Sequence, residues 1–136
     1  MPPGKIIPEL VYDDLDTAAA WLCDVLGFKE RLRIGNHRAQ LVLEGESIIA
    51  IQNPSRTDLP ANETNHSLMV RVDDVDRKFE QAVLHGARII SPPADYPYGE
   101  RQVSLEDIGG HRWTLTQSIA DVDPQDWGGV VVEKIG

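Results

Sequence analysis

Asp13-Asp14-Leu15-Asp16 and Asp73-Asp74-Val75-Asp76 are two copies of one short motif, and together they decide the fold of this chain. Each copy is followed by apolar residues at helical spacing and then by a glycine, Gly27 in the first case and Gly86 in the second. The separation between motif and glycine is almost the same in both copies. A unit that recurs once in a short chain usually pairs with its copy around a shared core or cleft. The sequence therefore predicts two similar halves.

Both halves show the same order of periodic segments. In the first half, alternating residues from Ile6 to Tyr12 predict a strand, and Asp14 or Asp16 can cap the helix that follows. A left-handed glycine stops this helix, and three short segments separated by turn residues predict three more strands. The second half repeats the plan. Each half is therefore predicted to be a βαβββ module, which gives an α+β fold.

The chain has the size of one domain. Its 136 residues and 41% hydrophobic content are ordinary for a globular protein. A stretch rich in proline, serine, threonine and asparagine shows no periodicity and is typical of a linker between the halves. We expect a single domain with halves at about 5–53 and 66–117, a linker at 54–65, and a C-terminal tail at 118–136.

Charge and apolar patterning restrict the partners and the compartment. The 22 acidic and 13 basic residues give a formal net charge of -9, whereas nucleic acids and anionic membranes attract cationic surfaces. We therefore expect neither partner, and a cationic or neutral ligand is easier to accommodate. No apolar stretch is long enough for a membrane span, and the start shows no signal-peptide pattern. The lone Cys23 agrees with a reducing compartment, so we expect a cytoplasmic protein.

Three motifs, taken with their order and spacing, carry a family resemblance. They are the first aspartate cluster, Leu26-Gly27-Phe28 at the predicted helix end, and Glu106-Asp107-Ile108-Gly109-Gly110-His111 before the last strand. From Ile6 to Trp127 the chain resembles the vicinal oxygen chelate superfamily of glyoxalase I, bleomycin-resistance proteins and extradiol dioxygenases. The resemblance implies two modules curled into an incomplete barrel, a ligand in its concave cleft, and a homodimer.

The resemblance also implies positions for metal ligands. In metal-dependent members these are histidines and glutamates on the first and last strands of each half, and the matching residues here are Ile7, Ala50, Ser67 and Thr114. None of them is a usual ligand of a divalent ion. We therefore expect no metal cofactor, and a metal-free small-molecule binding protein of the glyoxalase and bleomycin-resistance type.

Alternation within the strands predicts which side chains face the cleft. In each strand that borders it, one alternating set is strongly apolar and suits packing under a helix, while the other set is mixed. On the last strand of the first half, the mixed set includes Ala50 and Gln52. Such a mixture of apolar and hydrogen-bonding groups is typical of small-molecule pockets. The predicted ligand-binding residues on these strands are Glu9, Gln52, Ser67, Met69, Arg71, Thr114 and Thr116.

Each of these side chains also has a purely structural interpretation. Glu9 and Arg71 can pair with each other or with solvent, and Met69 can be ordinary packing. The loop before residue 102 adds Tyr96, Tyr98 and Arg101, which could stack on a flat ligand and hydrogen-bond its edge. The same tyrosines, placed beside prolines, could instead pin the loop to its own domain.

A second interpretation of the site involves a metal. His66 directly precedes Ser67, and a one-residue bulge would bring it into the cleft beside Glu9. His66 and Glu9 are then an alternative site for a divalent metal ion, and the protein would be a metal-dependent lyase, isomerase or dioxygenase. Glu9 could also act as a base without metal. No catalytic set can be assembled from the sequence, so enzymatic activity stays open, as does a scaffold role based on a dimer surface.

Overall fold

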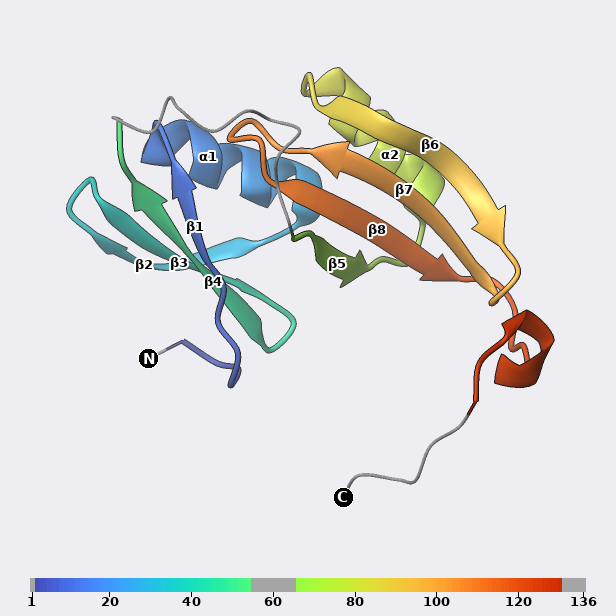
Figure 1. The fold of residues 1–136 in the computed structure, drawn as a ribbon. Coiled ribbons are helices and arrows are strands. Elements are labelled where there is room, and N and C mark those ends of the chain that lie inside the picture. The colour runs from blue at the N-terminus through green and yellow to red at the C-terminus, as the bar shows by residue number, and fades with distance from the viewer. Residues whose placement is uncertain (1, 55–65, 131–136) are drawn as a thin grey trace.

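Two four-stranded sheets, each covered by a helix, make up the computed structural model, which describes residues 2–54 and 66–130 (Figure 1). The first half contains β1 (Glu9–Tyr12), α1 (Leu15–Trp21), the π-helical turn η1 (Leu22–Leu26), β2 (Lys29–Ile34), β3 (Arg38–Leu43) and β4 (Glu46–Gln52). The second contains β5 (Leu68–Arg71), α2 (Val75–Leu84), β6 (Arg88–Tyr96), β7 (Glu100–Glu106) and β8 (Arg112–Ser118), and the 3-10 helix η2 (Pro124–Trp127) follows. The predicted pair of βαβββ modules is confirmed.

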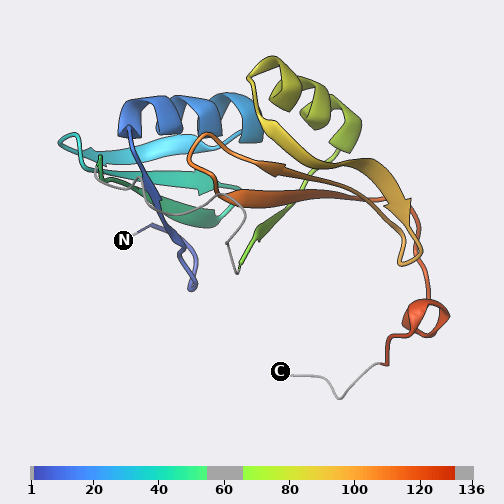
Figure 2. The ribbon, with the colours of Figure 1, turned by 45° about the horizontal axis from the view of Figure 1, so that its top comes forward.

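The two sheets have the same strand order. Sheet A runs β1-β4-β3-β2 and sheet B runs β5-β8-β7-β6. In each sheet the first strand is parallel to the last, and the other neighbours are antiparallel. Figure 2 shows α1 and α2 in one layer on the same side of both sheets. No strand pairing joins the two sheets within the described residues, so they do not close into a barrel.

The repeated aspartates cap both helices, as predicted. Asp14 accepts hydrogen bonds from the backbone of the first turn of α1, and Asp74 does the same for α2. Gly27 and Gly86 end the two helical segments with φ of 85° and 75°, a region in which a side chain is strained. The helices are short, and in the described part of the chain none is long and apolar enough to cross a membrane.

A buried carboxylate, that of Asp107, connects the two halves. Asp107 is 6% exposed and accepts the hydroxyl of Tyr12 at 2.6 Å and the indole Nε1 of Trp113 at 3.0 Å. Its other oxygen accepts the backbone N–H groups of Gly109 and His111 at 2.9 and 3.0 Å. A Cβ on Gly109 would lie 2.5 Å from the Tyr12 ring, so only glycine fits there. Tyr12 belongs to the first half and the other four residues to the second.

Two further contacts reinforce this connection. The imidazole Nε2 of His111 donates to the backbone carbonyl of Val11 at 2.7 Å. The Trp113 ring meets Phe28 edge to face, with centroids 6.0 Å apart. Both contacts lie in the core between the helices and the sheets, where the largest fully buried side chains include Trp113, Tyr12, Leu15, Leu22, Leu41, Leu105 and Leu115. The halves are thus held together by side chains rather than by a shared sheet.

We expect Asp107→Asn to lower the free energy of unfolding by about 2 kcal/mol or more, because hydrogen bonds to a charged group contribute roughly 1.5–3 kcal/mol each. The amide also turns an N–H group toward donors that need an acceptor. Urea unfolding followed by tryptophan fluorescence measures the change. The exposed Asp126→Asn is the matched control, expected within about 0.5 kcal/mol of the parent. Equal effects of the two substitutions would contradict the role of Asp107.

Candidate functional site

The face of sheet B away from α2, called here the open face, holds a compact network around Glu100. The Glu100 carboxylate accepts the Thr116 hydroxyl at 2.7 Å and the Ser118 hydroxyl at 2.6 Å. Arg71 donates to the Ser118 hydroxyl at 2.6 Å and lies 3.9 Å from the Glu100 carboxylate. The Arg71 side chain is 72% exposed. A charged, solvent-accessible donor is thus anchored on the rim of an ordered polar surface.

The network continues along the same face. Gln102 donates through Nε2 to the Thr116 hydroxyl at 3.1 Å, and its Oε1 accepts the Tyr98 hydroxyl at 2.9 Å. The hydroxyls of Ser104 and Thr114 are 3.3 Å apart farther along the strands. Alternation of side chains in β7 and β8 places all these groups on one side of the sheet.

Met69 and Arg71 lie where the sequence placed them. In the parallel pair β5 and β8, Met69 is opposite Thr114 and Arg71 is opposite Thr116, so the four side chains share the open face. Met69 is well exposed there. Their role in ligand binding stays a prediction.

The network also controls the charge of Glu100. Hydrogen bonds from Ser118 and Thr116 lower the pKa of the Glu100 carboxyl below its usual range, and the nearby Arg71 cation acts in the same direction. Glu100 is therefore ionised at neutral pH and serves as an acceptor, not as a proton donor.

Because the pKa of Glu100 is lower in the folded than in the unfolded chain, its ionised form stabilises the fold above the unfolded carboxyl pKa. This stabilisation is lost as the pH falls through the folded pKa. We expect Glu100→Gln to lower the free energy of unfolding at neutral pH. This gap in unfolding free energy between the variant and the parent protein should close in acid. Urea unfolding across the pH range measures the gap. Glu80→Gln, on an exposed position of α2, is the control. A gap that is constant with pH would contradict this account.

Three aromatic rings border the open face at the β6–β7 turn. Tyr96 and Tyr98 stack with centroids 5.5 Å apart, and Trp127 from η2 meets Tyr98 edge to face at 5.8 Å. Burial raises the pKa of the Tyr98 hydroxyl. The tyrosines therefore do pin the turn to the tail, and the partly exposed Tyr96 ring still presents a flat apolar surface.

Arg101 does not belong to this face. It alternates with Glu100 and Gln102 and so lies on the helix side of β7, where it pairs with Asp76 and Asp95 at 2.9 Å each. Both ion pairs raise its pKa. Its prediction as a cleft residue is wrong, because loop proximity alone did not show which way the strand turns its side chains.

The expected register of β4 is also wrong. Ala50 is fully buried, and Gln52 accepts the backbone N–H of Leu15 at the start of α1 at 3.0 Å, so both face the helix. Ile49 and Ile51 are consequently on the open face of sheet A. The cause is that both alternating sets of this strand contain isoleucine, so hydrophobicity could not distinguish the faces.

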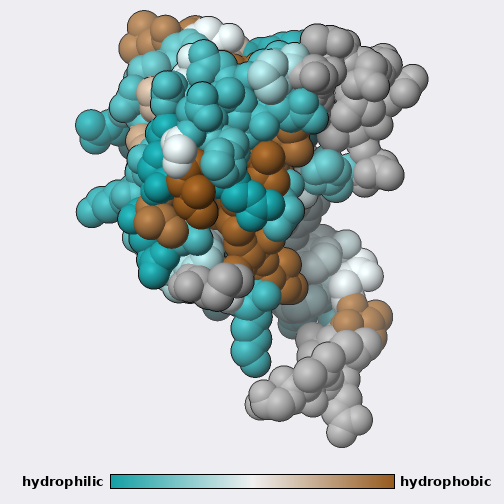
Figure 3. All heavy atoms as spheres, turned by 90° about the vertical axis from the view of Figure 1, so that its left-hand side faces the viewer, coloured by the Kyte–Doolittle hydropathy of each residue, from teal (hydrophilic) through white to brown (hydrophobic). Residues whose placement is uncertain are grey.

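The open face of sheet A is mainly apolar, in contrast to that of sheet B. Leu32 and Ile34 of β2 are 43% and 45% exposed on it. Figure 3 views the molecule from the left-hand side of Figure 1, where sheet A lies, and shows apolar surface gathered between hydrophilic groups. Strand pairing puts the following on this face: Glu9, Val11, Leu32, Ile34, Arg38, Gln40, Ile49 and Ile51.

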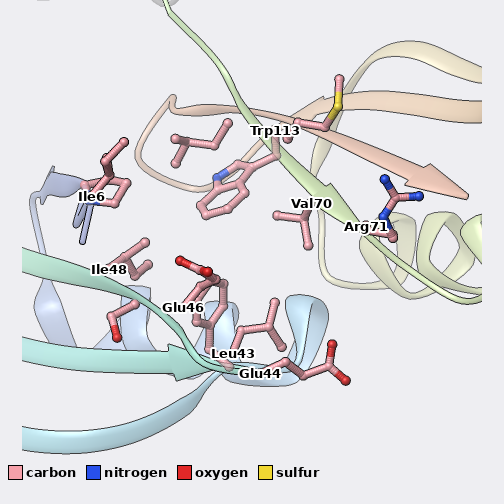
Figure 4. A pocket seen from close by; sticks show the side chains of 13 residues that line it. Ile6, Leu43, Glu44, Glu46, Ile48, Val70, Arg71 and Trp113 are labelled. Carbon is pink, nitrogen blue, oxygen red and sulfur yellow. The ribbon is translucent and has the colours of Figure 1, made fainter. Parts of the chain in front are cut away.

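A cavity of about 450 Å³, called here the inter-half pocket, lies between the two modules. Its apolar walls include Phe28, Leu43, Ile48, Leu68, Val70 and Trp113. In Figure 4, Trp113 and Val70 face Ile48 and Leu43 across the space, while Arg71 points away from it. The sequence did not predict this pocket, because its two walls are separated along the chain and meet only through tertiary packing.

A second hollow, of about 520 Å³, surrounds the start of β5 and β8 on the open face of sheet B. It is lined by His66, Ser67, Ile90, Ser104, Arg112, Trp113 and Thr114. Glu9 is not among these lining residues. Glu9 therefore does not share this hollow with His66, and the alternative metal site at these two residues stays a prediction.

The chain's relationship to known proteins agrees with this geometry. A family model described as the Glyoxalase/Bleomycin resistance protein/Dioxygenase superfamily matches residues 7–115. This chain belongs to that superfamily. The resemblance seen in the three sequence motifs is thereby confirmed, together with the fold class.

Solved structures resemble the chain to different extents. TioX from Micromonospora sp. ML1 shares 33% identity, covering 85% of this chain and 99% of TioX, with a TM-score of 0.69. FosX of Listeria monocytogenes, a fosfomycin resistance protein solved with Mn(II) and sulfate, has a TM-score of 0.70 over 87% of this chain and 92% of FosX. At 17% identity that likeness concerns the fold alone.

An uncharacterized protein of Mycobacterium bovis is 32% identical over 69 residues, which cover 51% of this chain and 45% of that relative. The match thus spans less than half of the relative's length.

The metal used by a neighbour such as FosX does not fit the residues found here. The family positions hold Ile7, Ser67 and Thr114, and the β4 position holds Ala50 under the helix, with Ile49 and Ile51 on the open face. Within residues 2–54 and 66–130, no three His, Cys, Asp or Glu side chains gather into a potential metal site. Hydrocarbon side chains offer no donor atom to a divalent ion.

Proposed function

We propose that this protein is a metal-free binding protein for a small organic molecule, held on the open face of sheet B. The observation that carries the proposal is the network joining Arg71, Glu100, Thr116 and Gln102. An ordered set of donors and acceptors beside exposed apolar surface is the usual composition of a small-molecule site. Binding is favoured over catalysis because Glu100 is held ionised by hydroxyls and is poorly suited to donate a proton.

The surroundings of the network suggest the shape of the ligand. The rings of Tyr96 and Tyr98 stand at one end of the face, and Met69 lies at its exposed edge. Aromatic rings and a thioether accept flat apolar groups, while Arg71 and the hydroxyls select polar atoms at the ligand's edge. We therefore propose an amphipathic, partly planar ligand. Ser67 at the start of β5 and Glu9 on the facing edge of sheet A stay as proposed contacts.

The test is a screen by two-dimensional amide NMR in the presence of EDTA, using flat aromatic compounds that carry one neutral, cationic or anionic polar group. We expect hits to shift the amide signals of Met69, Arg71, Thr114 and Thr116 saturably. Arg71→Ala should weaken these hits by about tenfold, because it removes a charged hydrogen-bond donor.

Arg101→Ala is the matched control for this screen, since it removes an arginine from the opposite face of the same sheet. It should leave the Kd of each hit unchanged. Hits that shift only Phe28 and Ile48 would place binding in the inter-half pocket and contradict the proposed site. Hits that disappear on chelation would contradict metal-free binding.

We also propose that the chain acts as a cytoplasmic homodimer. The exposed Leu32 and Ile34 on the open face of sheet A support this, because a monomer seldom leaves apolar side chains gathered on an edge strand. Sedimentation velocity should give the mass of two chains. Replacement of both residues by lysine should give one chain, and a parent protein that sediments as a monomer would contradict the proposal.

A further inference from the structure

We infer that the ligand of this protein carries an anionic group, such as a carboxylate or phosphate, which binds at Arg112 in the hollow at the start of β5 and β8. The inference rests on the proposed function, because this hollow is part of the open face of sheet B. It names the chemical class of the ligand and the residue that recognises it. It also reverses the expectation of a cationic or neutral ligand that follows from the net charge.

Arg112 makes no hydrogen bond to an acidic partner in residues 2–54 and 66–130. Arg112 lines the hollow, and its nearest ion-pair partner among the described residues is Glu106, with Nε to Oε1 at 3.9 Å. That separation is too long for a hydrogen bond. Nε is buried and has no hydrogen-bond partner within the described chain, so an anion in the hollow would meet the exposed end of the guanidinium group rather than Nε. By comparison, Arg71 and Arg101 both donate to protein oxygens at 2.9 Å or less.

The charge around Arg112 also favours an anion. Glu106 is buried and lies between two arginines, 3.5 Å from Arg88 and 3.9 Å from Arg112. One carboxylate cannot neutralise two guanidinium groups, so the trio keeps a positive charge.

The side chains that line the hollow are also suited to an anion. Its other polar side chains are His66, Ser67, Ser104 and Thr114, all of which can donate a hydrogen bond. No carboxylate is among the lining residues in the part of the chain that the structure describes. In a chain with a net charge of -9, a hollow with one arginine, several donors and no acid is suited to an anion.

The experiment titrates inorganic phosphate and phenylphosphonate into the whole protein and follows the amide signals of Ser67, Ser104 and Thr114. Benzylamine, a cation of similar shape to phenylphosphonate, is the comparison probe. We expect saturable shifts with both anions and none with benzylamine. Arg112→Gln should weaken binding by about tenfold or more, and Arg112→Lys by less, because lysine keeps the charge but loses the fork of donors.

Arg88→Gln is the matched control, since it removes the same charge from the same partner, Glu106, but from outside the hollow. It should weaken phosphate binding clearly less than Arg112→Gln does, because it removes a nearby charge but no donor that lines the hollow. The inference is overturned if Arg88→Gln weakens binding as much as Arg112→Gln, or if neither anion gives saturable shifts in a folded protein. Two further outcomes separate the inference from the proposed function. Neutral compounds that bind the open face as tightly in Arg112→Gln as in the parent protein would overturn the inference of an anionic ligand and leave the proposed function intact. Phosphate bound at Arg112 without any organic hit would support the inference and contradict the proposed function.

Discussion

The carboxylate of Asp107 is the interaction on which the arrangement of this molecule depends. The two sheets share no strand pairing in the described chain, so the halves are oriented by a few buried side chains. Asp107 gathers the Tyr12 hydroxyl from one half and the Trp113 indole from the other, and a buried charge tolerates little displacement from its donors. The same Trp113 forms a wall of the inter-half pocket, so this one contact also shapes a cavity.

The two sheets have the same strand order, but their open faces carry different kinds of side chain. Sheet A presents isoleucine, leucine and valine side chains, whereas sheet B presents hydroxyls, amides and paired charges. The helix sides are nearly equivalent: Gln52 and Gln117 each accept the first backbone N–H of the neighbouring helix. The duplicated module has therefore kept its internal contacts and diverged where side chains meet solvent, which is where we propose that the ligand binds.

The fold could be predicted from the sequence because its signals are local. Aspartate caps, glycine stops and alternation each act within a few residues, and their repetition identified the modules. The positions of Met69, Arg71, Thr114 and Thr116 followed from strands with one plainly apolar set. The register of β4 did not follow, since isoleucine occurs in both of its sets. The side of the sheet on which Arg101 lies and the existence of the inter-half pocket depend on tertiary packing. The lack of a hydrogen-bond partner for the Arg112 Nε in the described chain becomes visible only in the interatomic distances.

The central claim is that the superfamily frame is used here without a metal ion. Elemental analysis of protein purified without chelators, followed by calorimetric titration with manganese, nickel, zinc and iron, tests it most directly. The account predicts no tightly bound metal and no saturable heat, because isoleucine, serine and threonine stand on the open faces where the family ligands would be. A stoichiometric, tightly held divalent ion would contradict this claim and would favour a metal-dependent enzyme instead.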